Sequence, residues 1–228
     1  MSTHYDDEAQ VEDLRRWWKE NWKPLAIGLV LGLSAIFAYE AYTRNKDNKR
    51  AEASQLFEEL KAAVTGNKYD EAVKMGDRLV ADFDSTPYAV AGALKLAQAA
   101  VEASKLEEAR ARLEWAAANA KDAALKPLIQ LRLARVTWQQ GKAPEALKLL
   151  DGDAGTYAVL FDELRGDIKL AEGDRAAALA EYNKALGVLG TATAGTPNAP
   201  IAEALQRKVD DLADVASAAP AAAAAVTP

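Results

Sequence analysis

The chain has 228 residues, of which 50% are hydrophobic and 27% are charged, and its formal net charge is −6. It contains no cysteine and a single histidine, His4, which excludes disulfides, thiolate nucleophiles and cysteine-based metal sites and argues against a Ser–His dyad or a multi-histidine metal site. The acidic balance argues against nucleic acid as the main partner. We therefore expect a protein that is not an enzyme, binds no cofactor or metal and has no nucleic-acid partner.

A polar and charged tail, residues 1–23, precedes an apolar segment over residues 24–42, in which Glu40 is the one formal charge. As a helix with a rise of about 1.5 Å per residue, this segment is about 28 Å long, close to the bilayer core of about 30 Å. Aromatic residues flank it, as at the two interfaces of a membrane: Trp17, Trp18 and Trp22 before it, and Tyr39 and Tyr42 at its end. The pattern predicts a transmembrane helix.

This segment has two other interpretations. A buried core helix would leave the flanking aromatic residues unexplained, and the segment shows no amphipathic pattern. A cleaved signal peptide requires a small residue three positions before the cut. Cleavage after Ala35, Ala38 or Ala41 would place Leu33, Ile36 or Tyr39 at that position. An uncleaved signal anchor is therefore the preferred interpretation.

The orientation of the anchor does not follow from charge. Four basic residues lie close to each end of the segment, so the positive-inside rule gives a tie. A short tail followed by a large domain is consistent with a cytoplasmic N-terminus and an exported C-terminal domain.

Gly28 and Gly32 form a GxxxG step inside the segment. This spacing lets two membrane helices approach closely, so the two glycines are candidates for helix packing in the membrane. Glycine is also common in membrane helices without such a contact.

Beyond the segment the sequence is rich in alanine, favours helices and is broken at short intervals, with little alternation typical of strands. The predicted helices lie near residues 51–64, 69–82, 87–103, 106–120, 126–140, 143–151, 157–172, 174–189 and 199–216. The short turns favour antiparallel hairpins. We expect an all-α fold with one domain over residues 43–216, and a disordered Ala/Pro tail over residues 217–228.

The hairpins repeat. Four turn sequences are followed by an alanine at the same place, at intervals of 37, 37 and 32 residues: Ala72, Ala109, Ala146 and Ala178. Twelve residues before three of them stand small residues on the preceding helix: Ala97, Ala134 and Gly166. Small residues on both helices of a pair permit close packing, as in the tetratricopeptide repeat of 34 residues. The sequence therefore predicts a solenoid of about four hairpins and a C-terminal helix.

Several stretches resemble one family. They are QVEDLRRWWKENWKPLAIGLVLG (10–32), ALKLAQAAVEASKLEEA (93–109), IQLRLARVTWQQGKAPEALKLLD (129–151) and LRGDIKLAEGD (164–174). In their order and spacing they are similar to the YfgM family, the ancillary subunit of the SecYEG translocon. The resemblance implies a single-pass protein of the bacterial inner membrane with a cytoplasmic tail and a periplasmic repeat domain. It also implies association with SecYEG and with a membrane-anchored, isomerase-like periplasmic chaperone.

A hairpin solenoid presents a curved surface lined by the first helix of each pair, which suits the binding of a helix or an extended segment. Candidate partner-binding residues were placed by helical spacing from the small residues: Gln98, Arg135, Trp138, Glu163 and Asp167. An exposed Trp beside an Arg is typical of a binding hot spot. Packing of Trp138 between adjacent repeats is an equally good interpretation.

Two functions remain in view. The preferred one is a protein-interaction module anchored in the bilayer that docks at the Sec translocon and helps to pass exported chains to periplasmic chaperones. The alternative is a tethered repeat scaffold of another envelope complex, in cell division or outer-membrane assembly. Exported chains are further candidate partners.

Overall fold

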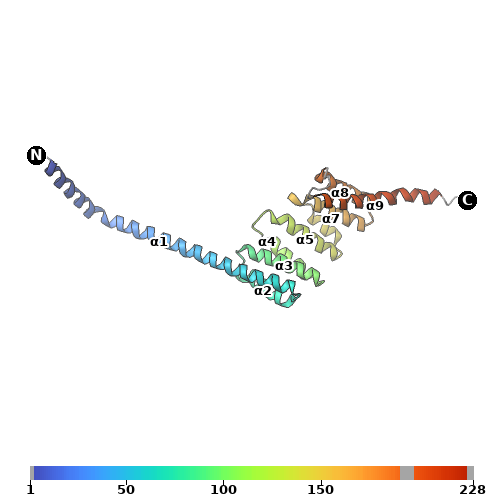
Figure 1. Cartoon of the computed structure of the whole chain (residues 1–228), viewed down its shortest axis with the longest axis horizontal. Coiled ribbons are helices and arrows are strands. Elements are labelled where there is room, and N and C mark those ends of the chain that lie inside the picture. Colours follow the sequence, from blue (N-terminus) through green and yellow to red (C-terminus); the bar gives the residue numbers. More distant parts are fainter. Residues whose placement is uncertain (1–2, 191–197, 225–228) are drawn as a thin grey trace. The chain divides into compact units, whose positions relative to one another are not determined.

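The structure is a computed structural model that describes the backbone of residues 3–190 and 198–224 and the side chains of residues 11–190 and 198–213. Its contacts divide the chain into two units, residues 1–52 and residues 53–228; we call the second unit the repeat domain. All secondary structure in the described residues is helical, which confirms the all-α prediction. Figure 1 labels the helices in chain order.

The first unit is formed by helix α1 (Thr3–Thr65), whose last residues belong to the repeat domain. A separate helix was expected from residue 51. The structure has one continuous helix instead, because residues 43–50 include neither glycine nor proline and nothing there ends a helix. Pro24 lies inside α1. Within the described part of the chain, α1 is the one helix long and apolar enough to cross a membrane.

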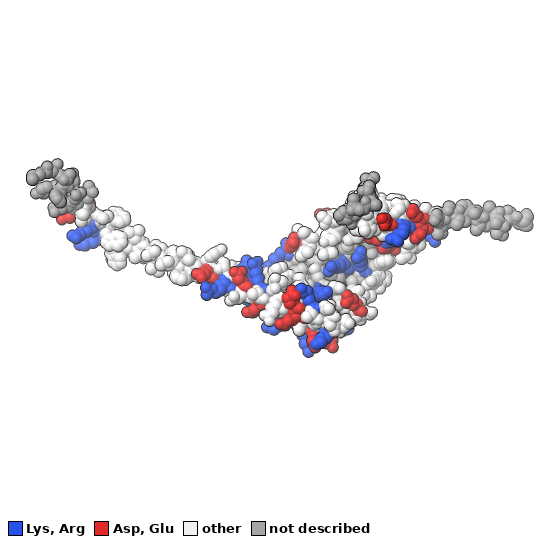
Figure 2. Space-filling view, viewed as in Figure 1, with Lys and Arg blue, Asp and Glu red and all other residues white. Residues whose placement is uncertain are grey.

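The apolar segment of α1 is exposed along its length. No residue of its most hydrophobic window is buried within the protein, and Leu29, Leu31 and Phe37 are each exposed by about two thirds. Figure 2 shows this stretch without charged side chains, between charged groups at either end. A helix exposing this much apolar surface on every side is unsuited to water and suited to lipid.

The repeat domain continues with α2 (Tyr69–Asp82), α3 (Pro87–Glu102), α4 (Leu106–Asn119), α5 (Leu125–Gln139), α6 (Ala143–Leu149), the 3-10 turn η1 (Gly155–Tyr157), α7 (Ala158–Ala171), α8 (Arg175–Leu189) and α9 (Ala199–Ala224). Most predicted ends agree with these bounds to within about two residues. The exceptions are the start of α1 and the end of α9.

The first helix of every hairpin ends in the same turn. At this turn one residue has a positive φ: Asn67 (55°), Ser104 (59°), Gly141 (79°) and Gly173 (86°). The amide of the following residue donates to a carbonyl five residues earlier, as in Lys68 to Ala63. This is the Schellman termination of a helix. The four turns recur at the intervals predicted from the sequence, which explains why the breaks could be located there.

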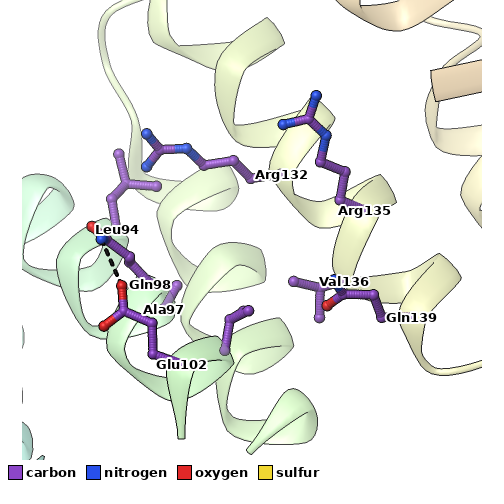
Figure 3. A pocket seen from close by; sticks show the side chains of 9 residues that line it. Leu94, Ala97, Gln98, Glu102, Arg132, Arg135, Val136 and Gln139 are labelled. Carbon is purple, nitrogen blue, oxygen red and sulfur yellow. Dashed lines mark hydrogen bonds between the residues drawn. The ribbon is translucent and has the colours of Figure 1, made fainter. Parts of the chain in front are cut away.

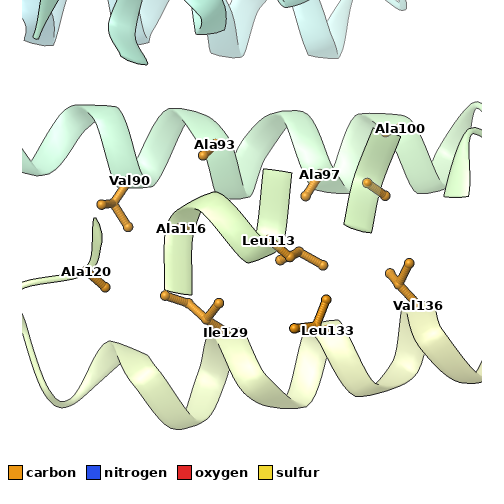
Figure 4. Packing of buried hydrophobic residues seen from close by; sticks show 11 residues of the cluster. Val90, Ala93, Ala97, Ala100, Leu113, Ala116, Ala120, Ile129, Leu133 and Val136 are labelled. Carbon is orange, nitrogen blue, oxygen red and sulfur yellow. The ribbon is translucent and has the colours of Figure 1, made fainter. Parts of the chain in front are cut away.

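The predicted small residues lie at the centre of the pairs. Ala97 and Ala109 belong to one buried cluster, which joins α3, α4 and α5 (Figure 4), and Ala134 and Ala146 belong to the next, which joins α5, α6 and α7. In the fourth pair, a Cβ atom on Gly166 would lie 2.6 Å from Cδ1 of Tyr182. The register of small residues is therefore confirmed in the second and third pairs. In the fourth pair Gly166 lies against the ring of Tyr182, whereas the sequence pattern pairs it with Ala178.

Polar contacts connect the second helices of successive pairs. Arg112 donates to Asp77 and links α4 to α2, while Arg110 donates to both carboxylate oxygens of Glu145 and links α4 to α6. Tyr69 donates to Glu108 over 2.7 Å. Burial and this hydrogen bond raise the pKa of Tyr69 to about 12. These contacts fix the stagger between neighbouring hairpins.

Helix α9 closes the last pair. Leu205 is fully buried and Leu212 is nearly so, in a cluster with Tyr182 of α8. The helix continues to Ala224, consistent with the high helix propensity of alanine. The disorder expected for residues 217–228 stays a prediction, and residues 225–228 lie outside those described.

Candidate functional site

A groove opens between α3 and α5, the first helices of the second and third pairs (Figure 3). Its volume is about 300 Å³. Nine residues line it: Leu94, Ala97, Gln98, Val101, Glu102, Arg132, Arg135, Val136 and Gln139. We call this set the α3–α5 groove.

The floor of the groove is apolar because residues of α3 and α5 that line it belong to one buried cluster or pack against it. Figure 4 shows α3 and α5 running in the same direction, with small residues of α3 facing α5. Ala97 and Val136 are buried, while Leu94 and Val101 are half-buried and pack against the same cluster. Part of this apolar surface therefore stays open to a ligand.

The rim of the groove is polar. Gln98 donates to Glu102 over 2.8 Å and accepts from Lys95, so its amide is held in place on α3. Arg132 and Arg135 lie one turn apart on α5 and are exposed. Among the described residues neither arginine forms an ion pair or a side-chain hydrogen bond. The rim can therefore bind a hydrogen-bond acceptor or an anionic group.

The structure brings together two of the five predicted partner-binding residues, Gln98 and Arg135. Each follows a buried alanine by one position, and a step of one residue turns about 100° around a helix, from the buried face to the rim. Arg132, one turn before Arg135, was not predicted. Its signal was present in the LRLAR sequence, since residues three apart share a helix face.

Trp138 lies elsewhere. Its side chain is half-buried and packs against the cluster that joins α5, α6 and α7. Because it follows Ala134 by four residues, it shares the buried face of α5. The structure thus favours the packing interpretation of Trp138 and places it outside the α3–α5 groove.

Glu163 and Asp167 contact helix α9. The Nζ atom of Lys208 donates to Glu163 Oε1 over 2.8 Å and to Asp167 Oδ1 over 2.7 Å, and Tyr182 donates to the same Asp167 oxygen. Burial works against the charge of Lys208, but the bonds to Asp167 and Glu163 outweigh it and raise the pKa of Lys208. Burial and Asp167 also raise the pKa of Tyr182. These acids therefore hold the C-terminal helix in place.

Replacing Lys208 by methionine is expected to loosen α9. The change leaves Glu163 and Asp167, both half-buried, without their cation, and should lower the free energy of unfolding by about 1–2 kcal/mol. Hydrogen exchange of the α9 amides measures the loosening. The matched control is Arg207→Met on the same helix, because Arg207 bonds only to a carbonyl of its own helix in the described structure. Equal protection of α9 in both variants would remove the anchoring role of Lys208.

Gly28 and Gly32 lie on the apolar segment of α1, and nothing comes within 4 Å of a Cβ atom built on either one. Packing of a second helix at this step stays a prediction. Within residues 11–190 and 198–213, no three His, Asp or Glu side chains converge in a way that could hold a metal ion.

The model of the tetratricopeptide repeat-like domain family matches residues 15–214. The ancillary SecYEG translocon subunit of Escherichia coli is 32% identical over 93% of this chain and 99% of its own length. That of Neisseria gonorrhoeae is 26% identical over 93% of this chain and its full length. The chain is similar to translocon subunits, as the sequence predicts.

The fold has a counterpart among solved structures. TPR-like repeats of a Podosopora anserina kinesin light chain superpose with a TM-score of 0.56 and 17% identity, over 74% of this chain and 88% of that one. At this identity the likeness concerns the fold alone. Together, the family model, the relatives and the repeat architecture establish that this chain belongs to the family of ancillary SecYEG translocon subunits, the YfgM family, with a TPR-like domain.

Proposed function

We propose that this protein is a membrane-anchored interaction module that docks at the Sec translocon and helps to pass exported chains to periplasmic chaperones. One observation carries the proposal: in a chain of this family, a wholly exposed apolar segment of a helix, long enough to span a membrane, precedes a repeat domain with an open groove. The first part supplies location and the second supplies recognition. The direct partners are the translocon and a membrane-anchored, isomerase-like periplasmic chaperone.

The anchor has a physical consequence for binding. A domain tethered to the bilayer is confined to a layer next to it, so its effective concentration for another membrane protein rises without any new contact. A groove that binds its ligand with modest affinity is then sufficient to hold a partner in the same membrane. The open groove with its apolar floor and polar rim is suited to such reversible recognition of side chains.

The proposal fixes the topology: residues 1–23 in the cytoplasm, residues 24–42 in the inner membrane and the repeat domain in the periplasm. The support is the length of the apolar segment, its aromatic flanks and the large residues at every candidate cleavage position.

Protease added to spheroplasts is expected to digest the repeat domain and to leave the N-terminal tail intact. Immunodetection of an epitope at each end measures this directly, with a cytoplasmic protein as the control for intact membranes. A repeat domain that is degraded only after lysis would reverse the assignment.

A further inference from the structure

We propose that the α3–α5 groove recognises an extended, acidic segment of a partner protein, with a carboxylate side chain bound by Arg132 and Arg135 and an adjacent apolar side chain on the floor. This inference rests on the proposed recognition role of the groove and names the class of ligand that it takes.

The two arginines differ from those that join neighbouring helices of the repeat domain. Arg110 and Arg112 on α4 each reach a carboxylate of a neighbouring helix, at Glu145 and Asp77. Arg165 pairs with the buried Asp162. By contrast, within the described residues, Arg132 and Arg135 face the groove without a carboxylate partner although the protein carries a net charge of −6. A pair of such guanidinium groups one turn apart is complementary to a carboxylate, which each can bind through two N–H donors.

The groove also has a direction. Figure 3 shows Arg132 extending across the groove toward Leu94, Arg135 extending from α5 apart from Leu94, and Glu102 at the other end of the groove. Glu102 would repel a second carboxylate, and its hydrogen bond from Gln98 keeps it there. An acidic residue therefore binds at the arginine end, and the apolar residues next to it lie along Leu94 and Val101. A segment that is acidic throughout fits less well than one that alternates acidic and apolar residues.

The size of the groove favours an extended segment. Its volume of about 300 Å³ is at the lower end of pockets that bind small ligands, roughly 300–1,000 Å³. This is suited to individual side chains of a peptide, and the polar side chain of Gln139 on the rim is positioned to bond its backbone.

The test uses the full-length protein in micelles of a neutral detergent and a dye-labelled peptide, Gly-Glu-Leu-Glu-Val-Gly with blocked ends. A matched peptide carries Gln in place of both Glu residues. Fluorescence anisotropy at low salt is expected to show about tenfold tighter binding of the acidic peptide, since bonds between charged groups are about twice as strong as neutral ones. The preference should fall as salt is added.

The double variant Arg132→Gln/Arg135→Gln is expected to bind both peptides equally weakly. Its control is Lys126→Gln/Arg175→Gln, which removes the same charge at exposed positions outside the groove and should keep the preference for the acidic peptide.

Equal binding of both peptides by the unaltered protein overturns the inference, as does a preference for the acidic peptide that survives in the groove variant. The inference is also overturned if the protein binds phosphatidylglycerol vesicles through Arg132 and Arg135 and does not bind the acidic peptide. The peptide experiment contains no translocon, so its failure does not contradict the proposed function. Failure to capture the translocon from membranes, in turn, does not contradict the peptide result.

Discussion

Replacing Gly166 by alanine is expected to destabilise the repeat domain by about 1–3 kcal/mol. The new Cβ atom would lie 2.6 Å from Cδ1 of Tyr182, whose ring is fully buried. The ring cannot move aside without breaking the hydrogen bond from its hydroxyl to Asp167. Helix propensity alone would favour alanine by roughly 0.5–1 kcal/mol. A decrease in the free energy of unfolding therefore shows that the packing against Tyr182 outweighs helix propensity. Urea unfolding of the full-length protein in detergent, followed by circular dichroism, measures it.

Gly187→Ala is the matched control. Gly187 lies inside α8, no positive φ is found there, and nothing comes within 4 Å of a Cβ atom at this position. This variant should be more stable than the unaltered protein by up to about 1 kcal/mol. Ala134→Leu, at a fully buried position of the third pair, should destabilise as Gly166→Ala does. If Gly166→Ala stabilised the protein as much as the control, the register of small residues would be wrong.

Releasing the repeat domain from the membrane is expected to weaken its capture of the translocon by about a hundredfold, because tethering raises effective concentration by factors of this order. The variant begins at residue 49 and follows a cleavable signal peptide, so that it still reaches the periplasm. It should appear in the soluble periplasmic fraction, and far fewer translocon subunits should co-purify with it. A chimera that joins the same domain to an unrelated single-span anchor is the control and should recover much of the binding. A released domain that captured the translocon as well as the full-length protein would make the anchor dispensable.

The repeat architecture could be predicted from the sequence because its signals are local. Each hairpin turn has a residue that adopts positive φ, and each pair has small residues at fixed spacing, as at Ala134 and Ala146. The continuity of α1 was also readable, since residues 43–50 offer nothing that ends a helix. The prediction placed a boundary there because the composition changes, but a change from apolar to charged residues does not by itself break a helix.

The candidate site was predicted in part, and the reason is geometric. Gln98 and Arg135 stand one position after a buried alanine and reach the rim of the groove, whereas Trp138 stands four positions after one and returns to the buried face. The pairing of Glu163 and Asp167 with Lys208 joins residues more than forty positions apart. No local pattern could indicate this contact, because it depends on where α9 packs.

The central claim is association with the Sec translocon, and purification from native membranes tests it most directly. The full-length protein, carrying a C-terminal affinity tag, is extracted with a mild detergent and the captured proteins are quantified by mass spectrometry against an unrelated single-span protein at equal abundance. The account predicts that translocon subunits are enriched with this protein and not with the control. Enrichment of cell-division or outer-membrane assembly proteins without translocon subunits would contradict it.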